Sequence, residues 1–399
     1  MYLAEFLGIH SLTPKDIVEA VKQVVALDES DILLVVGSLV EGLGNSKSDL
    51  DLLLFTARTD VRPTSLDTIA LLTHECLIDL RVVPNTVIDA LLGRFRQWCL
   101  QSENARDAAA FNYEERKLLH RLSTGMALCG EARFQELQAS VSAHSLGRQK
   151  FDLARYMAST VQVDIAGLYQ AGDLLSVTFG AQDLLAHTAD ALLAGYGRIN
   201  PLPKWRIREL QSLPDEWSSD MPGRPTTSTA AMTFVELHRA PEVTSTESVL
   251  QHAIRITCFS RGLFPWMERR LSGTVCPLPQ LRVAPLNLAG QGEVLPCLDF
   301  DVQISFVGEH FEMWRLKDPK SVFRLSPLGY VIACLCDGGT SKSQIFKQVA
   351  MQVGTDAAAS AVQEVCNVID YGHLALETPV DEDALRSVLL RPPFSEVES

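Results

Sequence analysis

Residues 35–55 read VVGSLVEGLGNSKSDLDLLLF, an apolar run, a glycine-rich polar segment and a second apolar run that carries two aspartates. A carboxylate buried without a partner is strongly destabilising, so Asp49 and Asp51 need a shared reason to flank Leu50. In a strand, residues i and i+2 point to the same face, so both carboxylates project together while Leu50 packs on the other side. The stretch therefore predicts a buried strand with a pair of aspartates at its start.

This pair suits a hard divalent cation such as Mg²⁺, which prefers carboxylate oxygens and leaves positions open for water and phosphate. Upstream, Gly37 and Ser38 end the apolar run, and a glycine there lets a phosphate approach the backbone while the Ser38 hydroxyl donates to it. A third carboxylate, Asp79, lies within the apolar run CLIDLRVVP at 76–84, which allows a two-metal site. The alternative is a solvated turn, because an isolated D-x-D pair has no chemistry in most proteins.

Gly37, Ser38, Asp49, Asp51 and Asp79 together resemble the signature of the nucleotidyltransferase superfamily, which includes DNA polymerase beta, the CCA-adding enzymes and the aminoglycoside nucleotidyltransferases. The resemblance covers residues 1–100. It implies that the two neighbouring aspartates bind the metals and that the Gly-Ser pair contacts the nucleotide phosphates. It also implies that Asp79 is a further metal ligand or the general base.

Lys204 is a second candidate, in the segment PLPKW after a long helical pattern. By itself it reads as a surface lysine. In aminoglycoside nucleotidyltransferases a helical bundle follows the catalytic domain, and a proline-lysine segment in it supplies a triphosphate-binding lysine. Lys204 is similar, so the resemblance implies a nucleotide-binding role, with Arg206 and Arg208 as weaker candidates.

The composition is that of an ordinary globular chain of two or three domains, with 399 residues, 47% hydrophobic and 21% charged. We expect a cytoplasmic protein with no membrane partner, because we find no signal peptide and no apolar run of roughly 18 residues. The nine cysteines contain no C-x-x-C and are typical of reduced thiols. A formal net charge of −14 makes nucleic acid an unlikely partner.

The pattern along the chain predicts an α+β fold that starts with a small mixed-sheet nucleotidyltransferase domain at 1–100. We expect a helix at 14–27 and strands at 31–36, 50–55 and 77–83, with a second helix at 65–75 between the last two strands. Helical periodicity without a strand pattern then predicts a helical bundle at 101–272 that binds acceptor or nucleotide. We expect its last helix to be interrupted at Pro265.

A linker at 273–290 precedes a C-terminal domain at 291–399. There a strand pair (LDFDVQISFV and FEMWRL) is followed by a helix that begins after Ser326 and Pro327, stops at residues 337–339 and restarts from Thr340 or Ser341. This order resembles the PqqD-like winged-helix modules, which bind the leader of ribosomally made peptides. A DNA-binding winged helix is the rival, but 8 Lys and Arg against 16 Asp and Glu weigh against DNA.

The leading functional hypothesis is a Mg²⁺-dependent transferase that moves a nucleoside monophosphate from an NTP, with ATP as the default, to a hydroxyl group and releases pyrophosphate. The acceptor is a peptide or a small-molecule natural product. One alternative is an NTP-sensing or catalytically idle scaffold whose PqqD-like domain binds a peptide or protein. A weaker one is a toxin-like enzyme that nucleotidylates tRNA or protein.

Overall fold

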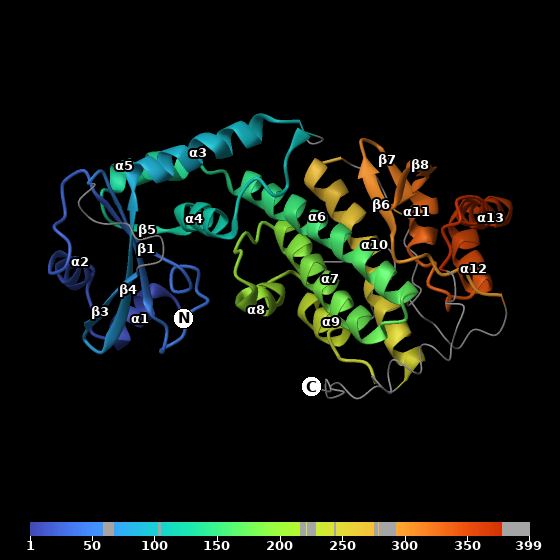
Figure 1. The fold of residues 1–399 in the computed structure, drawn as a ribbon, viewed down its shortest axis with the longest axis horizontal. Helices are drawn as coiled ribbons and strands as arrows, with labels where there is room; N and C mark the ends of the chain where they lie inside the picture. Colours follow the sequence, from blue (N-terminus) through green and yellow to red (C-terminus); the bar gives the residue numbers. More distant parts are fainter. Residues whose placement is uncertain are drawn as a thin grey trace, which may run out of the picture. The chain divides into compact units, whose positions relative to one another are not determined.

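The computed structural model describes residues 1–58, 68–102, 105–215, 221, 229–242, 245–274, 278 and 293–376. Within these ranges the chain has the predicted α+β fold (Figure 1). The chain forms two compact units, one of residues 1–149 and 199–208 and the other of residues 150–198 and 209–399. The division into three domains at 1–100, 101–272 and 291–399 stays a prediction.

The first unit is built on a mixed five-stranded sheet in the order β3-β4-β2-β1-β5. β2 and β4 are parallel and the other neighbours are antiparallel. The predicted strands at 31–36, 50–55 and 77–83 are confirmed as β1, β2 and β4. The five strands are β1 (Ile32–Val36), β2 (Leu50–Thr56), β3 (Thr68–Thr73), β4 (Cys76–Pro84) and β5 (Met126–Cys129).

Two local predictions in this unit are wrong. The segment expected as a helix at 65–75 contains strand β3, which forms a hairpin with β4. His74 and Glu75 join the two strands with φ of 46° and 60°, the double positive φ of a type I′ turn, which matches the twist of a two-residue hairpin. The segment β5 was expected to be helical, but it adds to the free edge of β1.

Helices cover both faces of this sheet (Figure 1). Alternate residues of β1 point to opposite sides, so Leu33 and Val35 pack with helices α1 and α2, while Leu34 and Val36 pack with helices α3, α4 and α5. The predicted helix at 14–27 is α2, which ends earlier. The helices are α1 (Leu3–Ile9), α2 (Pro14–Lys22), α3 (Asn85–Leu100), α4 (Tyr113–Thr124) and α5 (Glu131–Ala139).

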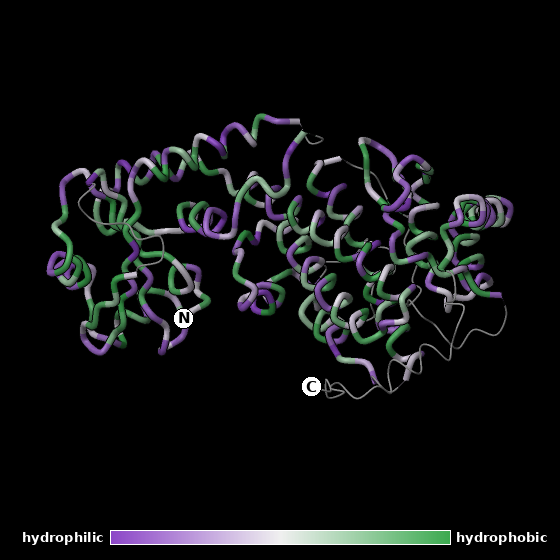
Figure 2. Tube along the Cα trace, viewed as in Figure 1, coloured by the Kyte–Doolittle hydropathy of each residue, from purple (hydrophilic) through white to green (hydrophobic). Residues whose placement is uncertain are grey.

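The second unit contains the long helices that the sequence predicts. Their turns alternate hydrophobic and hydrophilic residues (Figure 2), and the apolar faces form one core. The predicted break at Pro265 is wrong, because the helix runs through it with the proline inside. The helices of the second unit are most of α6 (Ala143–Gln170), α7 (Leu174–Gly195), α9 (Ala230–Leu237) and α10 (Thr246–Ser272). The helix η2 (Pro203–Trp205) belongs to the first unit, and α8 (Arg206–Gln211) begins there and ends in the second unit.

An antiparallel sheet in the order β6-β7-β8 completes the second unit with three helices. The predicted strand pair is confirmed as β6 and β7, and the expected helix start is confirmed by Ser326, whose hydroxyl accepts the N–H of Gly329 at 3.0 Å. Strand β8 was not predicted. The elements are β6 (Val302–Val307), β7 (His310–Arg315), β8 (Asp318–Leu325), α11 (Pro327–Ala333), α12 (Lys342–Val353) and α13 (Thr355–Tyr371).

Buried hydrogen bonds join this sheet to the helix α10. The guanidinium of Arg261 donates to the carbonyl oxygens of Asp299 at 2.7 Å and Val302 at 3.1 Å, and the Tyr330 hydroxyl donates to the Gly262 carbonyl at 2.5 Å. The helical bundle and the C-terminal sheet are therefore one folded body. Most of the predicted linker and the acidic tail from 377 onward lie outside the described residues.

None of the helices in the described ranges combines the length and the apolar character that a membrane crossing requires.

Candidate functional site

The Gly-Ser pair and the first aspartate pair meet where β1 ends. Val36 lies opposite Asp51 in the antiparallel register of β1 and β2. Gly37, the next residue, has a φ of +83°, which favours glycine, and a Cβ added there would lie 2.4 Å from Oδ2 of Asp51. Asp51 therefore lies directly against the Gly37 backbone, and the glycine is required by both conformation and space.

Ser38 begins a compact turn after the strand. Its carbonyl oxygen accepts the N–H groups of Leu43 at 2.8 Å and Gly44 at 3.0 Å, and the residue is partly exposed. The polar segment is thus held by its own backbone, with the partly exposed Ser38 at its start.

The third predicted carboxylate lies beside the first two. Asp79 of β4 is the register partner of Asp51 on the parallel strand β2. Both residues are on the face of the sheet that packs against α3, α4 and α5, because Leu50, Leu52, Ile78 and Leu80 pack on the opposite side. Burial raises the pKa of Asp79, and the nearby carboxylates of Asp49 and Asp51 and a hydrogen bond with Asp49 raise it further. The structure therefore gathers the three predicted aspartates in one place.

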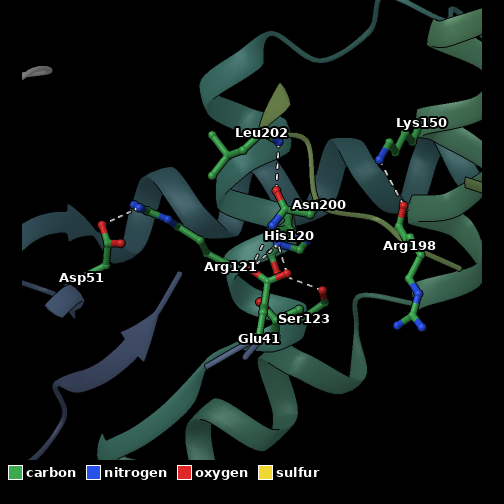
Figure 3. A network of polar contacts seen from close by, with 10 residues as sticks. Glu41, Asp51, His120, Arg121, Ser123, Lys150, Arg198, Asn200 and Leu202 are labelled. Atoms are coloured by element: carbon green, nitrogen blue, oxygen red, sulfur yellow. Dashed lines mark hydrogen bonds and ion pairs between the residues drawn. The ribbon is translucent and has the colours of Figure 1, made fainter. Parts of the chain in front are cut away.

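Arg121 of α4 is a site residue that the sequence reasoning missed. Its Nη2 lies 2.8 Å from Oδ1 of Asp51 (Figure 3), and the arginine is only 8% exposed. The pKa of Asp51 is raised. Burial is the largest cause and the charge of Asp49 adds to it, while the guanidinium of Arg121 acts in the opposite direction. The only sequence signal was the basic spacing of Lys117 and Arg121, four residues apart on one helix.

Further cations surround these carboxylates. Lys117 is half-buried, and its pKa is lowered by burial and then by Arg121, while Glu114 and Asp51 act in the opposite direction. The charge of Lys204 also lowers the pKa of Asp51, so the lysine from a distant segment lies close enough to act on it. Three cationic side chains and three aspartates thus share one site in the first unit.

Glu41 forms hydrogen bonds with the segment that carries Lys204. Its carboxylate oxygens accept from Asn200 Nδ2 at 3.1 and 3.2 Å, and Oε1 lies 3.0 Å from Nε2 of His120 (Figure 3). Arg208, a weaker nucleotide-binding candidate, donates to the carbonyl of Leu43 at 2.7 Å. The turn after β1, the helix α4 and residues 199–208 are therefore held together by polar contacts.

The donor chemistry of this site fits a divalent cation only in part. The carboxylates repel one another, and a bound cation relieves such repulsion. Within the described residues, however, no group of three or more His, Cys, Asp or Glu side chains is placed to hold a metal ion. Arg121 occupies one oxygen of Asp51, so the geometry presents three neighbouring carboxylates with a guanidinium among them rather than a closed metal cage.

Comparisons with known proteins add little. No model of a known protein family matches the chain, and no curated protein matches it in sequence. A crystal structure of a nucleotidyltransferase-like protein from Exiguobacterium sibiricum is similar over 64% of this chain and 74% of that chain, with 13% identity and a TM-score of 0.34. A TM-score this low carries no argument, so the function has to be inferred from the geometry of the site.

Proposed function

We propose that the first unit carries the active site of a nucleotidyltransferase that moves a nucleoside monophosphate, AMP by default, from an NTP to an acceptor hydroxyl. The observation that carries this proposal is the register of Asp51 with Asp79 on parallel strands, with Asp51 seated against Gly37. The turn that follows β1 would then supply backbone N–H groups and the Ser38 hydroxyl for phosphate oxygens. Three cations beside the carboxylates suit a triphosphate.

Each residue has a task that its position supports. Asp49, Asp51 and Asp79 are the groups that would hold Mg²⁺. A bound Mg²⁺ would polarise the phosphates and lower the pKa of the attacking hydroxyl. Lys117 and Lys204 would neutralise the charge that develops on the leaving pyrophosphate. Asp79 would either complete this metal site or accept the proton of the acceptor hydroxyl, and its raised pKa suits the second task. Arg121 would leave Asp51 for a phosphate oxygen when the nucleotide binds.

A groove in the second unit favours a peptide as the acceptor, delivered by the expected PqqD-like module. The groove has a volume of about 670 Å³ and lies between the edge strand β8 and the helix α13, with Phe323 on one side and Asn367 and Tyr371 on the other. An exposed edge strand accepts an extended peptide through main-chain hydrogen bonds, while pockets beside it select side chains.

The contribution of this groove is best tested by point substitution. A deletion after residue 285 would remove the carbonyl partners of the buried Arg261 and expose the core of the second unit. Tyr371 is 82% exposed, so Tyr371→Ala removes one of the two aromatic side chains that line the groove with little effect on folding. Met351→Ala is the matched control, because Met351 is 79% exposed and is not among the groove-lining residues. A small-molecule acceptor would be modified equally by both variants.

A second candidate function has its own support. The ion pair of Arg121 with Asp51, together with the absence of a three-carboxylate metal group among the described residues, favours an NTP-sensing or idle site. In that case the chain binds NTP without transferring it, and the C-terminal sheet is the working part.

Label transfer separates the two functions. Each α-³²P-labelled NTP in turn is incubated with Mg²⁺, the wild-type chain and a cell extract. Label in a new product supports the transferase, and the size of the product distinguishes a peptide from a small molecule. NTP binding in calorimetry without label transfer from any nucleotide supports the sensor.

A further inference from the structure

We infer that the second unit contains a binding site for a small phosphate-bearing ligand, separate from the aspartate site. A cavity of about 280 Å³ lies where the end of α9 and residues 239–241 face the start of α10. Its polar lining consists of Glu236, Arg239, Ser248, Gln251, His252 and Arg255.

The side chains from α10 lie on one face of that helix. Ser248, Gln251, His252 and Arg255 are spaced i, i+3, i+4 and i+7, which places them side by side along the helix. Arg239 and Glu236 approach from the neighbouring segment. The cavity is therefore a convergence of polar groups from two parts of the chain.

The charge of this cavity is positive in a chain that is strongly acidic. Two guanidinium groups face one carboxylate, whereas the whole chain has a net charge of −14. Arg239 and Arg255 are both exposed, and among the described residues neither has an ion pair or a side-chain hydrogen bond. Guanidinium groups present parallel N–H donors that match the geometry of phosphate, so unpaired arginines on opposite walls favour an anion between them.

The floor of the cavity is buried and polar. His252 is 8% exposed, and its Nε2 lies 2.7 Å from Nε2 of Gln182 on α7. Oε1 of Gln182 is buried without a partner. The amide Nε2 of Gln182 donates to Nε2 of His252, so the neutral imidazole carries its proton on Nδ1, which is left to donate to a ligand. A buried imidazole that a nearby amide orients is a preorganised donor for a phosphate oxygen.

Calorimetry with the full-length chain tests the site, with inorganic phosphate and phosphoserine as probes at constant ionic strength. Arg255→Gln is expected to weaken phosphate binding roughly tenfold or more, since it removes charge-assisted hydrogen bonds. Arg255→Lys is expected to weaken it less, because the charge remains. Arg324→Gln is the matched control, an exposed arginine of the same unit outside the cavity. Equal unfolding midpoints without phosphate verify that the variants fold.

Two further measurements separate this site from the aspartate site and identify the class of ligand. Lys117→Gln alters the aspartate site of the first unit, and in this background Arg255→Gln is expected to weaken phosphate binding by the same factor as in the wild type. Tighter binding of phosphoserine than of inorganic phosphate identifies a phosphate monoester as the ligand, and the reverse identifies the free anion. The inference is overturned if phosphate does not bind, if succinate binds as tightly, or if Arg255→Gln binds phosphate like the Arg324→Gln control.

Discussion

Glu41 links the turn after β1 to the segment that carries Lys204, so its substitution should loosen that segment. The Glu41 side chain is 15% exposed, and its partners His120 and Asn200 are 4% and 2% exposed. Hydrogen bonds to a charged group contribute about 1 kcal/mol more than neutral ones. Glu41→Gln weakens two such contacts, which predicts a local loss of about 2 kcal/mol, or about 30-fold in the opening equilibrium.

The amide proton of Leu202 is a direct reporter of this opening, because it is donated to Oδ1 of Asn200 at 2.9 Å. Hydrogen exchange of residues 199–208 should therefore be about 30-fold faster in Glu41→Gln, with no change in the buried helix α7 of the second unit. Glu19→Gln is the matched control, since Glu19 pairs with Lys22 on the surface. Equal exchange in both variants, or equal acceleration in α7, would refute the reasoning.

Three other predictions follow from buried contacts. Gly37→Ala should lower stability by about 1–3 kcal/mol in urea unfolding, since it strains a positive φ and collides with Asp51; unchanged stability would contradict the close approach. Burial lowers the pKa of His252, so below a pH of about 6.5 the unfolded chain binds a proton there that the folded chain does not, and stability should fall. His252→Leu should remove that pH dependence from the melting temperature. Burial raises the pKa of Cys258 to about 11 and that of Cys334 as well, so iodoacetamide at pH 8 should label neither until urea is added.

The central strands of the first sheet could be predicted because they are continuous apolar runs bounded by glycine and polar residues. β3 could not, because TIALLT carries apolar residues at spacings that suit a helix as well as a strand. Its state is decided by the turn at His74 and Glu75, where two non-glycine residues adopt positive φ. Tertiary pairing with β4 therefore overrides a local preference that the sequence leaves open.

The candidate site, like the sheet, could be predicted from the sequence only in part. The short spacing between Gly37, Asp49 and Asp51 made their proximity predictable, since one hairpin-like connection brings them together. Arg121 could not be assigned, because a basic residue in a helix normally reads as a solvated face. Only the packing of α4 on the sheet places its guanidinium at Asp51. The nearness of Lys204 depends on contacts between residues 41 and 200, which no local pattern encodes.

The measurement that tests the proposed nucleotidyltransferase most directly compares label transfer from α-³²P-NTP by Asp51→Asn and by Asp89→Asn. Asp89 is an exposed carboxylate on α3 and serves as the matched control. The proposal predicts full transfer by the wild type and Asp89→Asn and none by a folded Asp51→Asn. Full transfer by Asp51→Asn, or NTP binding by the wild type with no transfer to any acceptor, would contradict it.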